Sequence, residues 1–134
     1  MIPILVLTHG NLANELLAAA HEIDPFLVEG SEALSLPWDI DSDEGARQLK
    51  SALRRLDKGN GVIVLTDMFG GTATNLALPM MEPNKVEVVT GVNLPMLLKL
   101  GSLHKMDLEP SDYALRLSEA GRKSIRVASD LLRR

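Results

Sequence analysis

Four short apolar runs, each followed by a segment with helical character, constrain the fold of this chain more than any other feature. The runs cover residues 2–7, 33–38, 61–67 and 86–91. A continuous run of Ile, Val and Leu, such as the first, is typical of a strand that is covered on both faces. Strands that alternate with helices pair in parallel through right-handed crossovers. The sequence therefore predicts an α/β sandwich.

The segments between the runs carry the signals of helix ends. Asn11 is expected to cap a helix that Pro25 stops, and the stretch 41–56 begins with capping residues and has an amphipathic pattern. Ser111 is expected to cap a last helix that Gly121 ends. The tail 123–134 is ambiguous, because its apolar residues fit both a strand and a helix.

Composition limits what the chain can do. With 134 residues it has the size of one domain, expected over 1–134, and the lack of cysteine excludes disulfides and thiolate chemistry. A net charge of −4 without a basic stripe, and an aromatic content of 3%, argue against nucleic-acid binding. The apolar start is too short for a signal peptide or a membrane span, so a cytoplasmic location is expected.

The strand ends indicate where a site lies. Ligands of such sheets bind at the carboxyl ends of the strands. The loops at His9, at 67–72 and at 91–93 all follow apolar runs, so they are expected at one edge of the sheet.

His9 stands between a buried strand and a helix start. The positive end of a helix disfavours imidazolium and favours a nearby anion. A neutral imidazole keeps a nucleophilic lone pair, and histidine serves as a covalent nucleophile. His9 is thus a candidate phosphoryl acceptor. The alternative is a histidine in a polar turn without a function.

The loop after the third run adds candidates. The Asp67 carboxylate can accept the N–H of a histidine and so fix its tautomer, or it can simply cap the next helix. Gly70 and Gly71 allow backbone amides to converge on an anion, and the Thr72 hydroxyl can donate to a phosphoryl oxygen. The alternative for the glycines is a tight turn.

Other residues are assigned to structure rather than to chemistry. His21 and His104 are expected on the surface, and no set of three ligands indicates a metal. Met80, Met81 and Trp38 are expected to be packing residues, although Trp38 follows a strand end and so lies close to a candidate partner surface. P-loop, dinucleotide and G-x-S-x-G motifs are absent.

Three segments together resemble a known family. These are "ILVLTHGNLANELLAAA", "GVIVLTDMFGGTATNLAL" and "VEVVTGVNLPMLLKL". They are similar in order and spacing to the enzyme IIA domain of the mannose-type sugar phosphotransferase system. With the intervening helices, the resemblance spans nearly the whole chain.

The resemblance implies a fold and a dimer. It implies parallel strands in the order 2-1-3-4 with helices on both faces, a three-layer sandwich. It also implies a homodimer in which the C-terminal strand is antiparallel and exchanged between subunits. "SIRVAS" (124–129) is similar to that strand.

The resemblance also implies roles for single residues. It makes His9 the phosphorylated residue and Asp67 the residue that orients it. Gly10, Gly70, Gly71 and Thr72 match the positions around the phosphoryl group. The remaining matches lie in the loops beside the site or on its docking face: Met68, Phe69, Asn93 and Pro95. Core packing is an equal alternative for Met68 and Phe69.

The implied partners are other proteins of the system. The phosphocarrier HPr donates the phosphoryl group, a separate IIB protein accepts it, and the membrane components IIC and IID act indirectly. No cofactor and no fused IIB domain are expected. One alternative is a regulatory module whose partner senses the phosphorylation state of His9. Another is an α/β enzyme that binds a small anion at the same loops, although a single His–Asp pair offers no further catalytic group.

Overall fold

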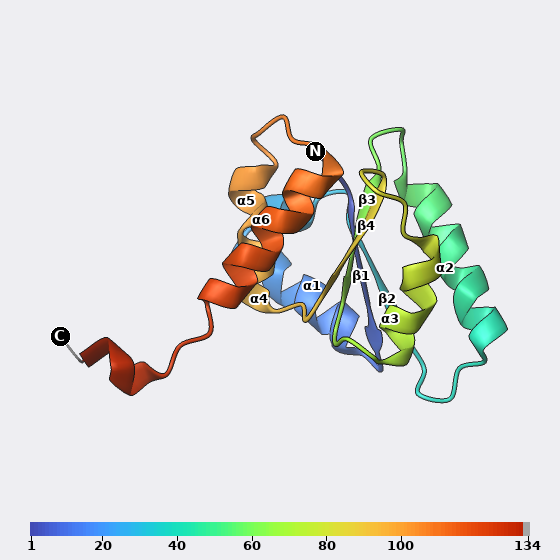
Figure 1. The fold of residues 1–134 in the computed structure, drawn as a ribbon, viewed down its shortest axis with the longest axis horizontal. Coiled ribbons are helices and arrows are strands. Elements are labelled where there is room, and N and C mark those ends of the chain that lie inside the picture. Colours follow the sequence, from blue (N-terminus) through green and yellow to red (C-terminus); the bar gives the residue numbers. More distant parts are fainter. Residues whose placement is uncertain (133–134) are drawn as a thin grey trace.

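The computed structural model describes residues 1–132 and shows the expected sandwich (Figure 1). Its sheet contains β1 (Ile4–His9), β2 (Glu32–Leu36), β3 (Val62–Thr66) and β4 (Val86–Thr90). All neighbours pair in parallel, in the order β2-β1-β3-β4. The predicted strand order 2-1-3-4 is therefore confirmed.

Helices cover both faces of the sheet (Figure 1). One face carries α2 (Ser42–Leu56) and α3 (Thr72–Ala77), which η2 (Leu78–Met80) follows. The other face is covered by α1 (Leu12–Ile23), η1 (Pro25–Val28), α4 (Leu94–Leu98), α5 (Leu100–Leu103) and α6 (Pro110–Lys123). Within residues 1–132, no helix has the length and apolar character that a membrane crossing requires.

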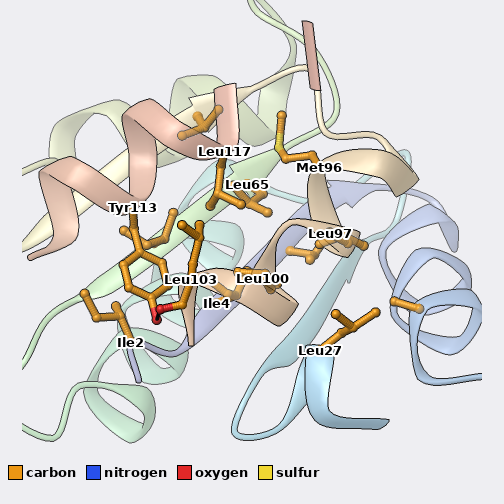
Figure 2. Close-up of a cluster of buried hydrophobic side chains, with 14 of the residues drawn as sticks. Ile2, Ile4, Leu27, Leu65, Met96, Leu97, Leu100, Leu103, Tyr113 and Leu117 are labelled. Atoms are coloured by element: carbon orange, nitrogen blue, oxygen red, sulfur yellow. Dashed lines mark hydrogen bonds between the residues drawn. The ribbon is translucent and has the colours of Figure 1, made fainter. Parts of the chain in front are cut away.

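β1 contributes side chains to two separate cores, because successive residues of a strand point to opposite faces of the sheet. Ile4 and Val6 pack beneath α4–α6, whereas Leu5 and Leu7 pack beneath α2 and α3. Figure 2 shows the first core, in which side chains from β1, β3, η1 and the helices α4–α6 meet. Residues 4–7 of β1 and 62–65 of β3 are thereby held between the two cores.

Three predicted helix ends, at Asn11, Ser111 and Gly121, are wrong. Asn11 occupies the N-cap position of α1 but makes no capping bond; instead the Thr8 hydroxyl accepts the Ala13 amide at 2.7 Å. α6 begins before Ser111 and continues past Gly121. A Cβ at Gly121 would lie 2.8 Å from Met96 Cε, so this glycine lets α6 approach α4 closely and does not end the helix.

The C-terminal segment leads away from the body of the molecule (Figure 1). Residues 125–127 have no regular structure, and η3 (Ala128–Leu132) follows. Ile125 and Val127 are exposed. The exchange of this segment between two subunits stays a prediction, because a single chain does not test it.

The expectation that His104 lies on the surface is wrong, whereas His21 is exposed as expected. His104 is 8% exposed, and its Nε2 lies 3.1 Å from the Leu27 carbonyl. A carbonyl only accepts, so Nε2 carries the proton. Nδ1 lies 3.1 Å from the Tyr113 hydroxyl. From the end of α5, the ring thus contacts both η1 and α6.

Burial of His104 makes stability depend on pH. Burial lowers the pKa of this imidazole below its usual value, although the Leu27 carbonyl opposes the effect. Below about pH 6.5 the unfolded chain binds a proton that the folded chain does not, so stability is full above that pH and is lost below it. We expect the free energy of unfolding to fall from pH 7.5 to 5.5, with a contribution of at most about 1.4 kcal/mol per pH unit.

Urea unfolding of the wild type and of His104→Gln at both pH values measures this contribution. The variant should be less stable at pH 7.5 and should lose less stability on acidification. His21→Gln serves as the control, because His21 is exposed and should leave the pH dependence unchanged. Equal slopes for the wild type and His104→Gln would contradict the prediction.

Candidate functional site

The candidate site lies where β1 and β3 end side by side. His9 is the last residue of β1, and Asp67 directly follows β3. The two strands pair in parallel, with Leu7 opposite Thr66. The topology thus brings together two residues that are 58 positions apart in the chain.

The carboxylate of Asp67 fixes both the backbone and the ring of His9. Its Oδ2 accepts the His9 amide at 3.0 Å and lies 2.7 Å from His9 Nδ1. Its Oδ1 accepts the Met68 amide at 3.0 Å. Because an ionised carboxylate only accepts, Nδ1 carries the proton. Nε2 is then left with a lone pair, which is the arrangement a nucleophilic imidazole requires.

Asp67 stays ionised at neutral pH. Burial raises the pKa of this carboxyl, but the hydrogen bonds from the backbone and ring of His9, and the attraction of the ring, outweigh that effect. The pKa of Asp67 therefore lies below its usual value. Both side chains of the pair are 13% exposed, so the contact is only weakly screened by water.

Glycines surround the pair and allow close approach. A Cβ at Gly71 would lie 2.8 Å from His9 Cε1 and 3.6 Å from Nε2, so only a glycine lets this backbone lie beside the reactive edge of the ring. Gly10 and Gly70 have φ angles of +56° and +84°, which L side chains rarely adopt. Thr72, exposed, begins α3 directly after these glycines.

Two buried threonines brace the loop that carries Asp67, and the sequence analysis missed both. The Thr74 hydroxyl donates to the Met68 carbonyl at 2.6 Å. Its oxygen lies 2.6 Å from the Thr66 hydroxyl, which therefore donates to it. The loop between β3 and α3 is thus tied to both elements. The one available signal was Thr66, a polar residue in an apolar run, and this signal does not show that Thr74 is its partner.

Trp38 also belongs to the site, contrary to the expected packing role. It is 80% exposed, and its indole stacks on the His9 ring, with centroids 5.0 Å apart and an interplanar angle of 17°. Its position after β2, the neighbour of β1, was the available signal. Of the two methionines expected to pack, Met80 is half-buried, whereas Met81 is 49% exposed.

The other predicted residues lie farther out. Met68 and Phe69 are 56% and 75% exposed, so the core-packing alternative is wrong for both. Asn93 acts within the fold: its Oδ1 accepts the Met96 amide at 2.9 Å and its Nδ2 donates to the Gly121 carbonyl at 3.2 Å. Pro95 lies, exposed, in the first turn of α4, as predicted.

The described residues, 1–132, contain no group of three or more His, Asp or Glu side chains that could hold a metal ion. At the site, the Gly71 backbone lies beside the His9 ring and the Trp38 indole stacks on it.

Comparison with known proteins gives one consistent result. A family model described as "PTS system fructose IIA component" matches residues 3–113. The mannose-specific EIIAB component of Escherichia coli (strain K12) is 32% identical to this chain, and the match covers 94% of the chain. The same match covers 39% of the length of that relative. The fructose-specific EIIA component of Bacillus subtilis (strain 168) is 28% identical over 98% of this chain and 90% of its own.

A solved structure agrees with these relatives. The PTS IIA protein associated with the fucose utilization operon from Streptococcus pneumoniae superposes with a TM-score of 0.83. It is 27% identical, and the match covers 98% of this chain and 97% of that one.

Proposed function

This chain belongs to the mannose/fructose enzyme IIA family of the sugar phosphotransferase system, and from that premise we propose that it carries a phosphoryl group on His9 Nε2. The observation that carries the proposal is the 2.7 Å contact between Asp67 Oδ2 and His9 Nδ1. This contact holds the proton on Nδ1 and leaves Nε2 as the nucleophile.

In the proposed transfer step, His9 and Asp67 of this chain act together with the phosphohistidine of HPr. The Nε2 lone pair attacks the phosphorus of phosphorylated HPr, a new N–P bond forms, and the N–P bond to the donor histidine breaks. The proton on Nδ1 stays in place. The ring then carries a positive charge, which faces the ionised Asp67. Phosphoryl transfer depends mainly on positioning and on charge stabilisation, and this arrangement supplies both.

The group is then passed to a IIB protein for sugar uptake and phosphorylation, with the membrane components acting downstream. This assignment rests on the family. The chain spans only 39% of the length of the E. coli relative, so the activity of that whole relative is not carried over to it. A cytoplasmic location and a homodimer belong to the same proposal.

The proposal is tested by intact mass after incubation with phosphoenolpyruvate, enzyme I and HPr. We expect the added mass of one phosphoryl group, labile to acid and dependent on HPr. Addition of IIB should then remove the group. A chain that gains no mass with an active HPr is not a phosphocarrier. Uptake without transfer to any IIB would favour the regulatory alternative.

Met68 and Phe69 are proposed to form part of the docking face for HPr. A histidine of HPr has to approach His9 closely, so the surface around the site must be open and partly apolar. Both side chains are exposed in the loop that carries Asp67. Aromatic residues are common among the side chains that dominate binding energy at such interfaces.

We expect Phe69→Ala to raise the KM for phosphorylated HPr about tenfold and to leave kcat nearly unchanged, because it removes a contact with the partner and not with His9. Uptake rates measured over a range of HPr concentrations separate the two constants. Leu115→Ala, which also removes an exposed apolar side chain but from α6, is the control. Unchanged kinetics in Phe69→Ala would remove this residue from the docking face.

A further inference from the structure

The backbone around Trp38 is held from both sides. The Leu36 carbonyl, at the end of β2, accepts the Gly10 amide at 2.8 Å. The Ile40 amide donates to the Pro37 carbonyl at 3.1 Å and so closes a turn around Trp38. Asp41 then caps α2. The indole is thus placed by the fold, although its surface faces solvent.

The placement brings the indole onto the face of His9. The two rings are stacked at 5.0 Å. A Cβ at Gly10 would lie 3.0 Å from Trp38 Nε1 and 3.5 Å from Cε2, so the absence of a side chain at Gly10 makes room for the indole. An 80% exposed tryptophan contributes little to the core, so its contact with His9 needs another explanation.

Three groups therefore contact the His9 ring from different directions. Asp67 contacts it at Nδ1, the Gly71 backbone lies beside Cε1 and Nε2, and the Trp38 indole covers a face. Asp67 alone would still allow the ring to turn about its hydrogen bond. The stacked indole restricts that rotation and keeps Nε2 directed toward the glycines.

We propose that Trp38 is a positioning residue for phosphoryl transfer, which holds the His9 ring in place and stabilises the positive charge that the ring carries once it is phosphorylated. The inference rests on the proposed function. A cation that lies over an indole face is attracted by the electrons of the ring. The uncharged His9 gains less from the same contact. Trp38 thus favours the phosphorylated state over the free one.

This role predicts a shift in an equilibrium and not only in a rate. A cation–π contact at an exposed position should change the equilibrium constant for transfer from phosphorylated HPr by about two- to fivefold. A residue that only helps HPr to dock would change the forward and reverse rates together. The equilibrium constant would then stay the same.

The test compares the wild type with Trp38→Leu and Trp38→Phe. Each protein is mixed with phosphorylated HPr until the phosphorylated fractions of both proteins are constant, and intact mass gives the equilibrium constant. We expect Trp38→Leu to lower it about two- to fivefold and Trp38→Phe to restore most of it. Leu115→Ala, which removes an exposed apolar side chain on α6, should leave it at the wild-type value.

Fluorescence gives an independent signature, because Trp38 is the only tryptophan in the chain. Its emission should change when the wild type is phosphorylated and should stay constant in His9→Ala under the same conditions. An equilibrium constant that is the same in the wild type and Trp38→Leu would overturn the inference while leaving the phosphocarrier role intact. A wild type that takes up no phosphoryl group would instead overturn the proposed function.

Discussion

Replacing His9 with alanine is expected to abolish phosphoryl uptake from phosphorylated HPr, with a loss on the order of a thousandfold or more. Nε2 of this residue is the atom proposed to form the new N–P bond. Within residues 1–132, its recorded side-chain partners, Asp67 and Trp38, offer no second nucleophilic nitrogen. The fold should survive, because His9 ends β1 and its side chain contributes little to either core.

The other two histidines provide the controls, since the chain contains three. His21 is exposed near the end of α1, so a phosphoryl donor could reach it, but within residues 1–132 no carboxylate is recorded as a partner of its ring. His104 is buried, and both of its ring nitrogens lie within hydrogen-bond distance of groups in the core. We therefore expect His21→Ala to be phosphorylated as fast as the wild type.

Intact mass and peptide mapping under alkaline conditions, where phosphohistidine survives, measure both variants. Loss of the added mass in His9→Ala together with its retention in His21→Ala would locate the phosphoryl group. A phosphorylated His9→Ala protein would contradict the assignment. Circular dichroism and the midpoint of urea unfolding show whether each variant is folded.

The strand pattern of the sequence was sufficient to predict most of the fold and the centre of the site. Buried apolar runs allowed the parallel sheet to be predicted, and the carboxyl ends of adjacent parallel strands necessarily lie together. His9 and Asp67 follow two such runs, so their proximity was predictable without knowledge of any side-chain contact. The structure places His9 Nδ1 and Asp67 Oδ2 2.7 Å apart, and the orienting role of the aspartate stays a prediction.

The misplaced residues share a physical cause. His104 is buried because a hydroxyl of α6 and a carbonyl of η1, the latter 77 positions away in the chain, both reach it. Gly121 lies inside α6 because Met96 occupies the space beside it. Trp38 contacts His9 because β2 is the neighbour of β1. Each position depends on packing between distant segments, which local sequence patterns do not encode.

The Asn11 cap failed for a different reason. A local rule selected the residue at the N-cap position, yet the hydroxyl of Thr8, within β1, accepts the amide of the first turn. Asn11 Oδ1 accepts from Asn14 Nδ2 instead. The arrangement ties the start of α1 directly to the strand that carries His9. The structure therefore couples the strand, the helix start and the reactive histidine more tightly than the predicted cap would.

Asp67→Asn is expected to slow phosphoryl uptake by about 100-fold without unfolding the chain, because an amide cannot satisfy the three donors that the carboxylate accepts. The His9 amide, His9 Nδ1 and the Met68 amide all direct N–H groups at Asp67. An asparagine presents one oxygen and one NH₂ group to these positions. The NH₂ group of the asparagine therefore always faces one of these N–H donors, with which it cannot form a hydrogen bond.

Either orientation of the asparagine harms the site. If its NH₂ group faces His9, Nδ1 has to accept, the proton moves to Nε2, and the nucleophilic lone pair is lost. If its NH₂ group faces the Met68 amide, His9 keeps its tautomer, but the positive charge of the phosphorylated ring loses its counter-charge. Both the rate of uptake and the equilibrium constant should therefore fall, whereas the KM for HPr should change little.

Asp107→Asn is the matched control for the loss of one negative charge. Asp107 is exposed and lies with Met1 and Gly61 around a hollow near the start of β3, away from His9. Stopped-flow mixing with phosphorylated HPr gives the rate for each variant, and intact mass gives the equilibrium constant. A wild-type rate in Asp67→Asn would show that the contact between Asp67 and His9 does not select the reactive tautomer. A fall in rate of the same size in Asp107→Asn would mean that overall charge, and not the hydrogen bond to Nδ1, controls the transfer.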